Sequence, residues 1–202
     1  MLWTLAYGGA ELLALFLKQP QTERSLARCG VPFLIAALFV QTTSGSPGLL
    51  RLPRRGSLRG PLIAGAIAVV GVAAFTRVVP SAHAVVLQHW ASPSEILRYL
   101  LLVPLSEELL FRGMLFTVTA RAIGPRTSTL SRTFPVVTSA VCFGLGHWQY
   151  HHFVFAQAWP QMVWATGFGL VLGYQRLRTG SLLPGLATHI GINLVAALVF
   201  LP

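Results

Sequence analysis

The stretch PLSEELLFRG, residues 104–113, decides how the rest of the chain is interpreted. It holds Glu107 and Glu108 side by side, although the chain has only five acidic residues in 202. The pair lies inside an apolar run, residues 96–118, that is long enough to cross a bilayer. A carboxylate at mid-bilayer costs roughly 2.5–3.5 kcal/mol, so such residues face a bundle interior or a hydrated cavity. Two together indicate a functional site.

Helical spacing separates the roles of the two carboxylates. Glu108 and Arg112 are four residues apart, which places them on one helix face and predicts an ion pair. Glu107 points about 100° away around the same helix and has no cation at helical spacing. We therefore assign Glu108 a supporting role with Arg112 and give Glu107 the stronger claim to chemistry. The alternative is a Glu–Arg pair that only fixes helix packing.

The composition predicts the fold class. Hydrophobic residues make up 54% of the chain and charged residues only 10%, which excludes an ordinary soluble domain. We predict an all-α, polytopic transmembrane helix bundle of about seven spans with a buried polar active site. Gly167, Gly169 and Gly173, in the sixth run, include a small-xxx-small pair, which predicts close helix packing. The predicted spans are residues 2–17, 29–50, 60–80, 96–118, 134–156, 159–175 and 182–201.

Basic residues give the chain a net charge of +10. They fall in short groups between the apolar runs, which is typical of cytoplasmic loops and not of a nucleic-acid-binding stripe. One group, residues 18–28, disagrees with this topology, so the run 2–17 either spans or lies in the interface. A Pro- and Arg-rich loop suggests a division into N-terminal transmembrane helices with a basic loop, residues 1–59, and a transmembrane core, residues 60–202, that holds the polar motifs.

Polar residues recur at helical spacing in two later apolar runs. Phe143 and His147 are four residues apart in the fifth run, and His189 and Asn193 are four apart in the seventh. A lone buried His is more often a hydrogen-bonded core residue than a ligand or catalyst. Three helices that each carry buried polar groups are costly unless those groups share one hydrated site. The set suits amide hydrolysis, which needs a base, a proton donor for the leaving nitrogen and donors for the oxyanion.

Three motifs resemble those of one protease family. EExxxR (Glu107, Glu108, Arg112), FxxxH (Phe143, His147) and HxxxN (His189, Asn193) are similar to the motifs of the CAAX-protease and bacteriocin-processing (CPBP) intramembrane proteases. The resemblance covers residues 104–195. It implies a helical bundle whose cavity opens laterally to lipid, and cleavage of a peptide bond near the membrane. Arg outnumbers Lys fourteen to one, which suggests a bacterial, myxosortase-like member.

The resemblance also implies a role for each residue. Glu107 would activate water with His147, while His189 and Asn193 would hold the oxyanion. Family members are described both as metalloproteases and as metal-free glutamate proteases. If a divalent metal such as zinc is used, its ligands would be Glu107, His147 and His189. Neighbouring carboxylates diverge on a helix, so we favour a Glu-activated water. The supporting residues would be Glu108, Arg112 and Phe143.

The leading hypothesis is an intramembrane endopeptidase that cleaves near the C-terminal region of a membrane-anchored protein or peptide. Its expected surroundings are the lipid bilayer, specifically the bacterial cytoplasmic (inner) membrane, with no nucleic-acid partner. One alternative is a non-catalytic membrane scaffold or bacteriocin-immunity protein of the same fold. Another is a small transporter, which would distribute polar residues over several levels of the bundle. All three motifs are complete here, which favours the enzyme.

Overall fold

Helices account for every regular element that the structure describes. The computed structural model describes residues 50–53, 55–78, 96–124, 128–151 and 153–198. The all-α prediction is confirmed for this part of the chain. In chain order the elements are η1 (Arg55–Ser57), α3 (Arg59–Val78), η3 (Arg98–Leu102), α6 (Val103–Glu107), η4 (Glu108–Leu115), α7 (Phe116–Ile123), α8 (Thr129–Gly146), η5 (His147–His151), α9 (Phe155–Thr179) and α10 (Leu183–Leu198).

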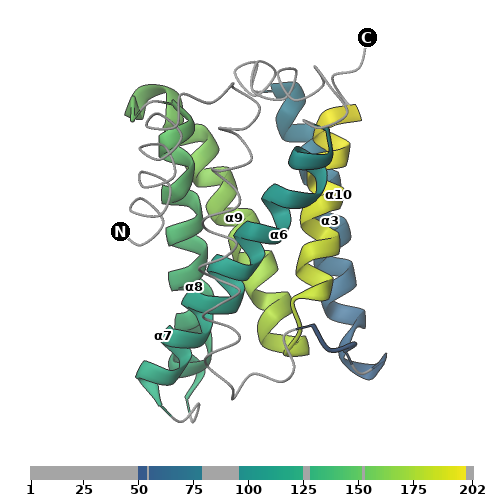
Figure 1. Ribbon diagram of the computed structural model, residues 1–202, viewed down its shortest axis with the longest axis vertical. Coiled ribbons are helices and arrows are strands. Elements are labelled where there is room, and N and C mark those ends of the chain that lie inside the picture. The colour runs from purple at the N-terminus through teal and green to yellow at the C-terminus, as the bar shows by residue number, and fades with distance from the viewer. Residues whose placement is uncertain (1–49, 54, 79–95, 125–127, 152, 199–202) are drawn as a thin grey trace, which may run out of the picture.

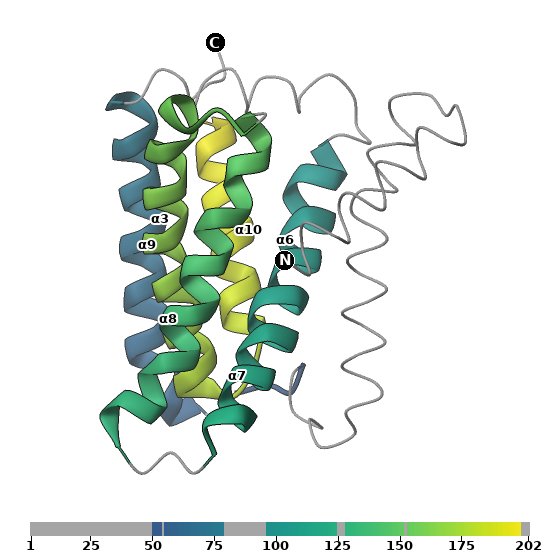
Figure 2. The ribbon, with the colours of Figure 1, turned by 90° about the vertical axis from the view of Figure 1, so that its left-hand side faces the viewer.

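Residues 98–123 form one continuous helical rod, which carries both central carboxylates. The rod joins η3, α6, η4 and α7 without a break, and the residues at each junction keep right-handed helical dihedral angles (Figure 2). Both η3 and η4 are π-helical, with a wider turn than an α-helix. π-helical turns are rare and often occur at functional sites. Glu107 is the last residue of α6 and Glu108 the first of η4, so the pair sits where the helix widens.

Small residues let α8 and α9 approach closely. A methyl group added at Gly169 would stand 2.8 Å from the Cα atom of Ala140. One added at Gly173 would stand 3.0 Å from a side-chain carbon of Val136. The predicted close packing at these two glycines is therefore confirmed, and α8 is held against α9 along its length (Figure 1).

Helix α10 connects the two sides of the bundle. It packs against α3 and α9, and it also contacts η3 and α6 of the rod (Figure 1). The buried core holds two apolar clusters. One is built on the rod, α8 and α9, and the other joins α3 to the end of α10. The buried members are Leu109, Leu110, Phe111, Met114, Phe143, Ala165 and Leu182 in the first cluster, and Ala68, Val72, Ile192, Ala196 and Ala197 in the second.

The predicted membrane topology includes runs of residues that the structure does not describe. None of the helices among the described residues combines the length and the apolarity required for a membrane crossing. The run 2–17 and all but the last residue of 29–50 lie outside the described residues. The count of about seven spans and the division at residue 59 stay predictions.

Candidate active site

A buried ion pair anchors the site on the rod. Arg112 Nη1 donates to Glu108 Oε1 at 2.9 Å, and the side chains are 0% and 1% exposed. This confirms the pairing predicted from spacing. The guanidinium carbon also lies 4.3 Å from the centre of the Phe143 ring. Among the described residues, Arg112 Nε and Nη2 have no hydrogen-bond partner. The cation–π contact with Phe143 therefore supplies part of the stabilisation that these two nitrogens lack.

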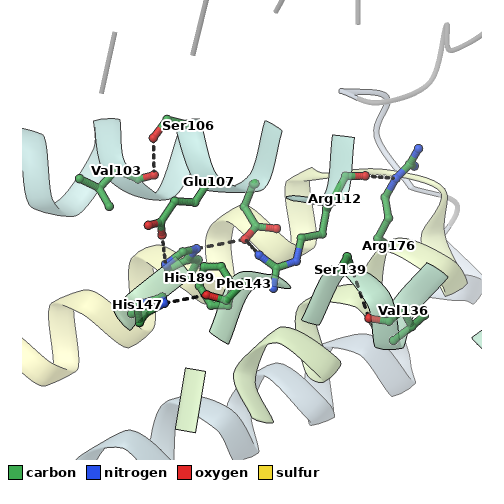
Figure 3. A network of polar contacts seen from close by, with 11 residues as sticks. Val103, Ser106, Glu107, Arg112, Val136, Ser139, Phe143, His147, Arg176 and His189 are labelled. Atoms are coloured by element: carbon green, nitrogen blue, oxygen red, sulfur yellow. Dashed lines mark hydrogen bonds and ion pairs between the residues drawn. The ribbon is translucent and has the colours of Figure 1, made fainter. Parts of the chain in front are cut away.

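His189 of α10 lies between the two neighbouring carboxylates. Its Nδ1 is 3.0 Å from Glu108 Oε1, and its Nε2 is 3.5 Å from Glu107 Oε2 (Figure 3). Glu107 and Glu108 do point in different directions, yet each reaches a different nitrogen of one imidazole. Carboxylate oxygens only accept hydrogen bonds, so an imidazolium, with an N–H on each side, satisfies both contacts. With His189 charged, two negative and two positive groups balance in a buried cluster.

Phe143 and His147 approach the cluster from α8. Phe143 is buried, and its ring meets His147 edge-on at 4.8 Å and His189 edge-on at 5.7 Å between ring centres. His147 is the first residue of η5, directly after α8, and its Nδ1 is 2.8 Å from the carbonyl oxygen of Phe143. Because a carbonyl only accepts, Nδ1 carries the hydrogen. In the neutral ring the lone pair is then on Nε2.

Asn193 lies one turn after His189 on α10, as its spacing predicted. It is 8% exposed, and its Nδ2 donates to the backbone carbonyl of Tyr99 at 2.9 Å. Tyr99 belongs to η3, so this bond ties α10 to the beginning of the rod. The seven predicted residues thus divide into three linked groups. Glu107, Glu108, Arg112 and His189 form a direct network, Phe143 and His147 pack against it, and Asn193 joins the rod through Tyr99.

A buried amide next to this network did not come from sequence reasoning. Gln175 of α9 is 0% exposed, and its Nε2 donates to the carbonyl oxygen of Pro61 and to Thr188 Oγ1, each at 2.8 Å. These bonds join α9 to α3 and to α10, beside His189. The signal that could have indicated this position is a single uncharged polar residue at the end of an apolar run. It was weak, because the partners of Gln175 are distant in sequence.

The beginning of α10 lies close to the Glu108 carboxylate. Gly185 lies in the first turn of α10, and a methyl group added there would stand 3.1 Å from Glu108 Oε2. The absence of a side chain lets the carboxylate approach the helix backbone. The N-terminus of a helix carries a partial positive charge, which stabilises an anion at this point. Glu108 is therefore held by Arg112, by His189 and by the field of α10.

The ligands named for the case of metal dependence were Glu107, His147 and His189. Across residues 50–53, 55–78, 96–124, 128–151 and 153–198, no three His, Cys, Asp or Glu side chains are gathered as a metal site requires. Both nitrogens of His189 face carboxylates, and Nδ1 of His147 faces a backbone carbonyl. A zinc ligand needs an imidazole lone pair directed at the metal. The assignment of Glu107, His147 and His189 as metal ligands stays a prediction, and we derive no step through a metal.

One family model matches the chain, over residues 88–195, and its description is type II CAAX prenyl endopeptidase Rce1-like. The match covers more than half of the protein. The chain belongs to this Rce1-like family. The predicted membership of the CAAX-protease group is thereby confirmed, and all seven predicted site residues lie within the matched segment. At the level of the family, this Rce1-like chain is an integral membrane protein and a hydrolase of the endopeptidase class.

The other comparisons add no relative. No curated protein and no solved structure matches this Rce1-like chain significantly. The match begins at residue 88, before the rod, and therefore includes η3 and Tyr99 as well as the three motifs. It ends at residue 195, inside α10. The polar network and the elements that hold it, apart from α3, thus lie in the family segment.

Proposed function

We propose that this Rce1-like protein is an intramembrane endopeptidase whose chemistry is performed by Glu107, His147, His189 and Asn193. It hydrolyses a peptide bond near the C-terminal region of a membrane-anchored protein or peptide. The observation that carries the proposal is the position of His189 against Glu107. A buried carboxylate and a buried imidazole from two different helices face each other at 3.5 Å, where a base and an oxyanion donor are both needed.

The net charge of the network and the substrate together is conserved during the attack of water. Glu107 takes a proton from water as the water oxygen bonds to the substrate carbonyl carbon. The negative charge of Glu107 is thereby transferred to the carbonyl oxygen. The Nε2–H of His189, which faces Glu107 in the resting enzyme, then donates to the oxyanion. At 3.5 Å its contact with Glu107 is longer than an ordinary hydrogen bond, so the resting contact is weak and the donor is available to the transition state.

His147 assists the transfer of protons. Its Nδ1–H is held by the Phe143 carbonyl, so the Nε2 lone pair accepts a hydrogen bond from the attacking water. When the tetrahedral intermediate collapses, the carbon–nitrogen bond breaks and the leaving nitrogen receives the proton that came from water. Asn193 supplies the second donor to the oxyanion.

The supporting residues keep this network in place. Arg112 neutralises Glu108, and Glu108 orients His189 through Nδ1. Phe143 contacts both imidazoles and the Arg112 guanidinium, so one ring fixes three functional side chains. Such support matters because catalytic groups must be held within a fraction of an ångström of their productive positions.

The family and the sequence support a proposal for the substrate class and the setting. A membrane-embedded endopeptidase acts on a protein or peptide that is itself anchored in the bilayer. We place the protein in a bacterial cytoplasmic membrane, where a myxosortase-like protease would trim the tails of anchored proteins. Water activation by Glu107 requires no metal in this scheme, and zinc is the competing assignment that the test below distinguishes.

The test follows cleavage by purified protein reconstituted in phospholipid vesicles. The probe is a fluorescence-quenched peptide fused to a single-span anchor, chosen from a panel for cleavage by the wild-type protein. We expect Glu107→Gln and His147→Ala each to reduce the rate by about 10²–10⁴-fold, the usual contribution of a general base. In the native cell, the same variants should leave membrane-tethered proteins at their unprocessed length.

Two controls sharpen this test. Val163 is 65% exposed on α9, so Val163→Ala should retain the wild-type rate. Stringent chelation should also leave the rate unchanged, whereas loss of activity that zinc restores would replace the glutamate mechanism by a metal one. Unchanged processing in both Glu107→Gln and His147→Ala would remove the protease proposal.

A further inference from the structure

The backbone carbonyl of Tyr99 is the partner that holds Asn193. Asn193 Nδ2 donates to it at 2.9 Å, across 94 residues of sequence. In an α-helix the carbonyl of residue 99 would accept from the amide of residue 103. Here the Val103 amide instead bonds to the carbonyl of Arg98, five residues back, in the π-helical pattern. The Val103 amide, which would bond to the Tyr99 carbonyl in an α-helix, therefore bonds to Arg98 instead.

Pro104 removes the next donor. Continuing the π-helical pattern, the amide of residue 104 would bond to the carbonyl of residue 99, but proline has no N–H. Pro104 is fully buried in the rod, at the beginning of α6. Asn193 therefore donates to a carbonyl that would bond to the amide of residue 103 in an α-helix or to the amide of residue 104 in a π-helix. The π-turn and the proline together direct the Tyr99 carbonyl to α10.

This contact determines how the Asn193 amide is oriented. A carbonyl oxygen only accepts, so the NH₂ group of Asn193 must face Tyr99. One Nδ2 hydrogen is used in that bond, and the second hydrogen and Oδ1 then have fixed directions. We infer that Tyr99 and Pro104 are positioning residues, which orient Asn193 so that its second hydrogen serves the oxyanion. The inference rests on the proposed function for the role of Asn193, and on the described contacts for its orientation.

Pro104→Ala is the decisive variant. It restores an N–H that competes with Asn193 for the Tyr99 carbonyl, while alanine suits a helix better than proline. We expect kcat for the anchored quenched peptide to fall about 10-fold with KM unchanged, which is less than the 10²–10³-fold loss typical of removing an oxyanion donor outright. We expect thermal stability in detergent to stay equal or rise. Pro160 also lies inside a helix, α9, and Pro160→Ala should leave kcat unchanged.

A double variant tests whether Pro104 acts through Asn193. If it does, adding Pro104→Ala to Asn193→Ala should produce no further loss of kcat, because the group being positioned is already absent. Multiplicative losses in the double variant would overturn the inference. So would a Pro104→Ala protein with wild-type kcat.

A measurement without substrate separates this inference from the proposed function. In ¹⁵N spectra of the full chain in detergent micelles, a fixed Asn193 side chain should give two well-separated Nδ2 proton signals. Pro104→Ala should bring these two signals together, whereas Pro160→Ala should not. An unchanged separation in Pro104→Ala would refute the positioning role. If the wild-type protein instead lacks Glu107-dependent cleavage, the proposed function fails and these spectra still decide the orientation of Asn193.

Discussion

The Glu108–Arg112 pair gives a stability prediction that can be worked from the structure. Two unit charges 2.9 Å apart attract by about 6 kcal/mol at an effective dielectric constant of about 20. Both side chains are almost fully buried, so the cost of removing the charges from water opposes this attraction. Arg112→Met fills a similar volume but leaves the Glu108 charge without its arginine partner and with His189 alone. Breaking a buried pair in this way costs about 3–5 kcal/mol.

The double variant isolates the charge term. Glu108→Gln together with Arg112→Met removes both charges, so it should recover at least about 2 kcal/mol of the loss caused by Arg112→Met. The contact between Arg112 and Phe143 is lost in both proteins and cancels in the comparison. The measurement is the free energy of unfolding, obtained by titrating dodecyl maltoside micelles with sodium dodecyl sulfate. A double variant as unstable as Arg112→Met would refute the reasoning, because Glu108 would then not be a buried anion that needs its cation.

Two further substitutions test the packing and the hydrogen bonds around the site. Gly169→Ala would place a methyl group 2.8 Å from the Cα atom of Ala140, so we expect a loss of about 1–3 kcal/mol of unfolding free energy. At Gly167, two residues earlier on the same helix, an added methyl group would meet no neighbouring atom within 4 Å, so Gly167→Ala should be neutral or stabilise by up to about 1 kcal/mol. Equal effects at the two glycines would contradict the described contact. Gln175→Leu removes the two hydrogen bonds that Gln175 Nε2 donates and should cost about 2–4 kcal/mol of unfolding free energy. Thr188→Val removes one of these bonds and should cost less. A Gln175→Leu protein as stable as wild type would show that these bonds contribute nothing.

Local spacing explains why much of the site was predictable. The Glu108–Arg112 bond and the contact of His147 with Phe143 both join residues four positions apart, and a helix brings such residues together whatever else surrounds it. The close approach at Gly169 and Gly173 was predictable for a similar reason, because residues without bulky side chains mark where helices can pack.

Other features depended on distant parts of the chain. Sequence reasoning had Glu107 and Glu108 pointing apart, and it did not reveal that His189 fills the space between them. It also proposed Asn193 as an oxyanion donor without identifying Tyr99, and it passed over Gln175. In each case the partner lies on another helix, and the rotation of one helix against another is set by side-chain packing over its whole length.

The amino-acid sequence by itself determined the helical class, the three motifs and the pairs within one helix, because these follow from composition and from the 3.6-residue period. Only the tertiary structure decided which nitrogen of His189 meets which carboxylate and where the amide of Asn193 points. The physical reason is that buried polar groups must find partners, and across helices those partners are selected by how the helices pack together.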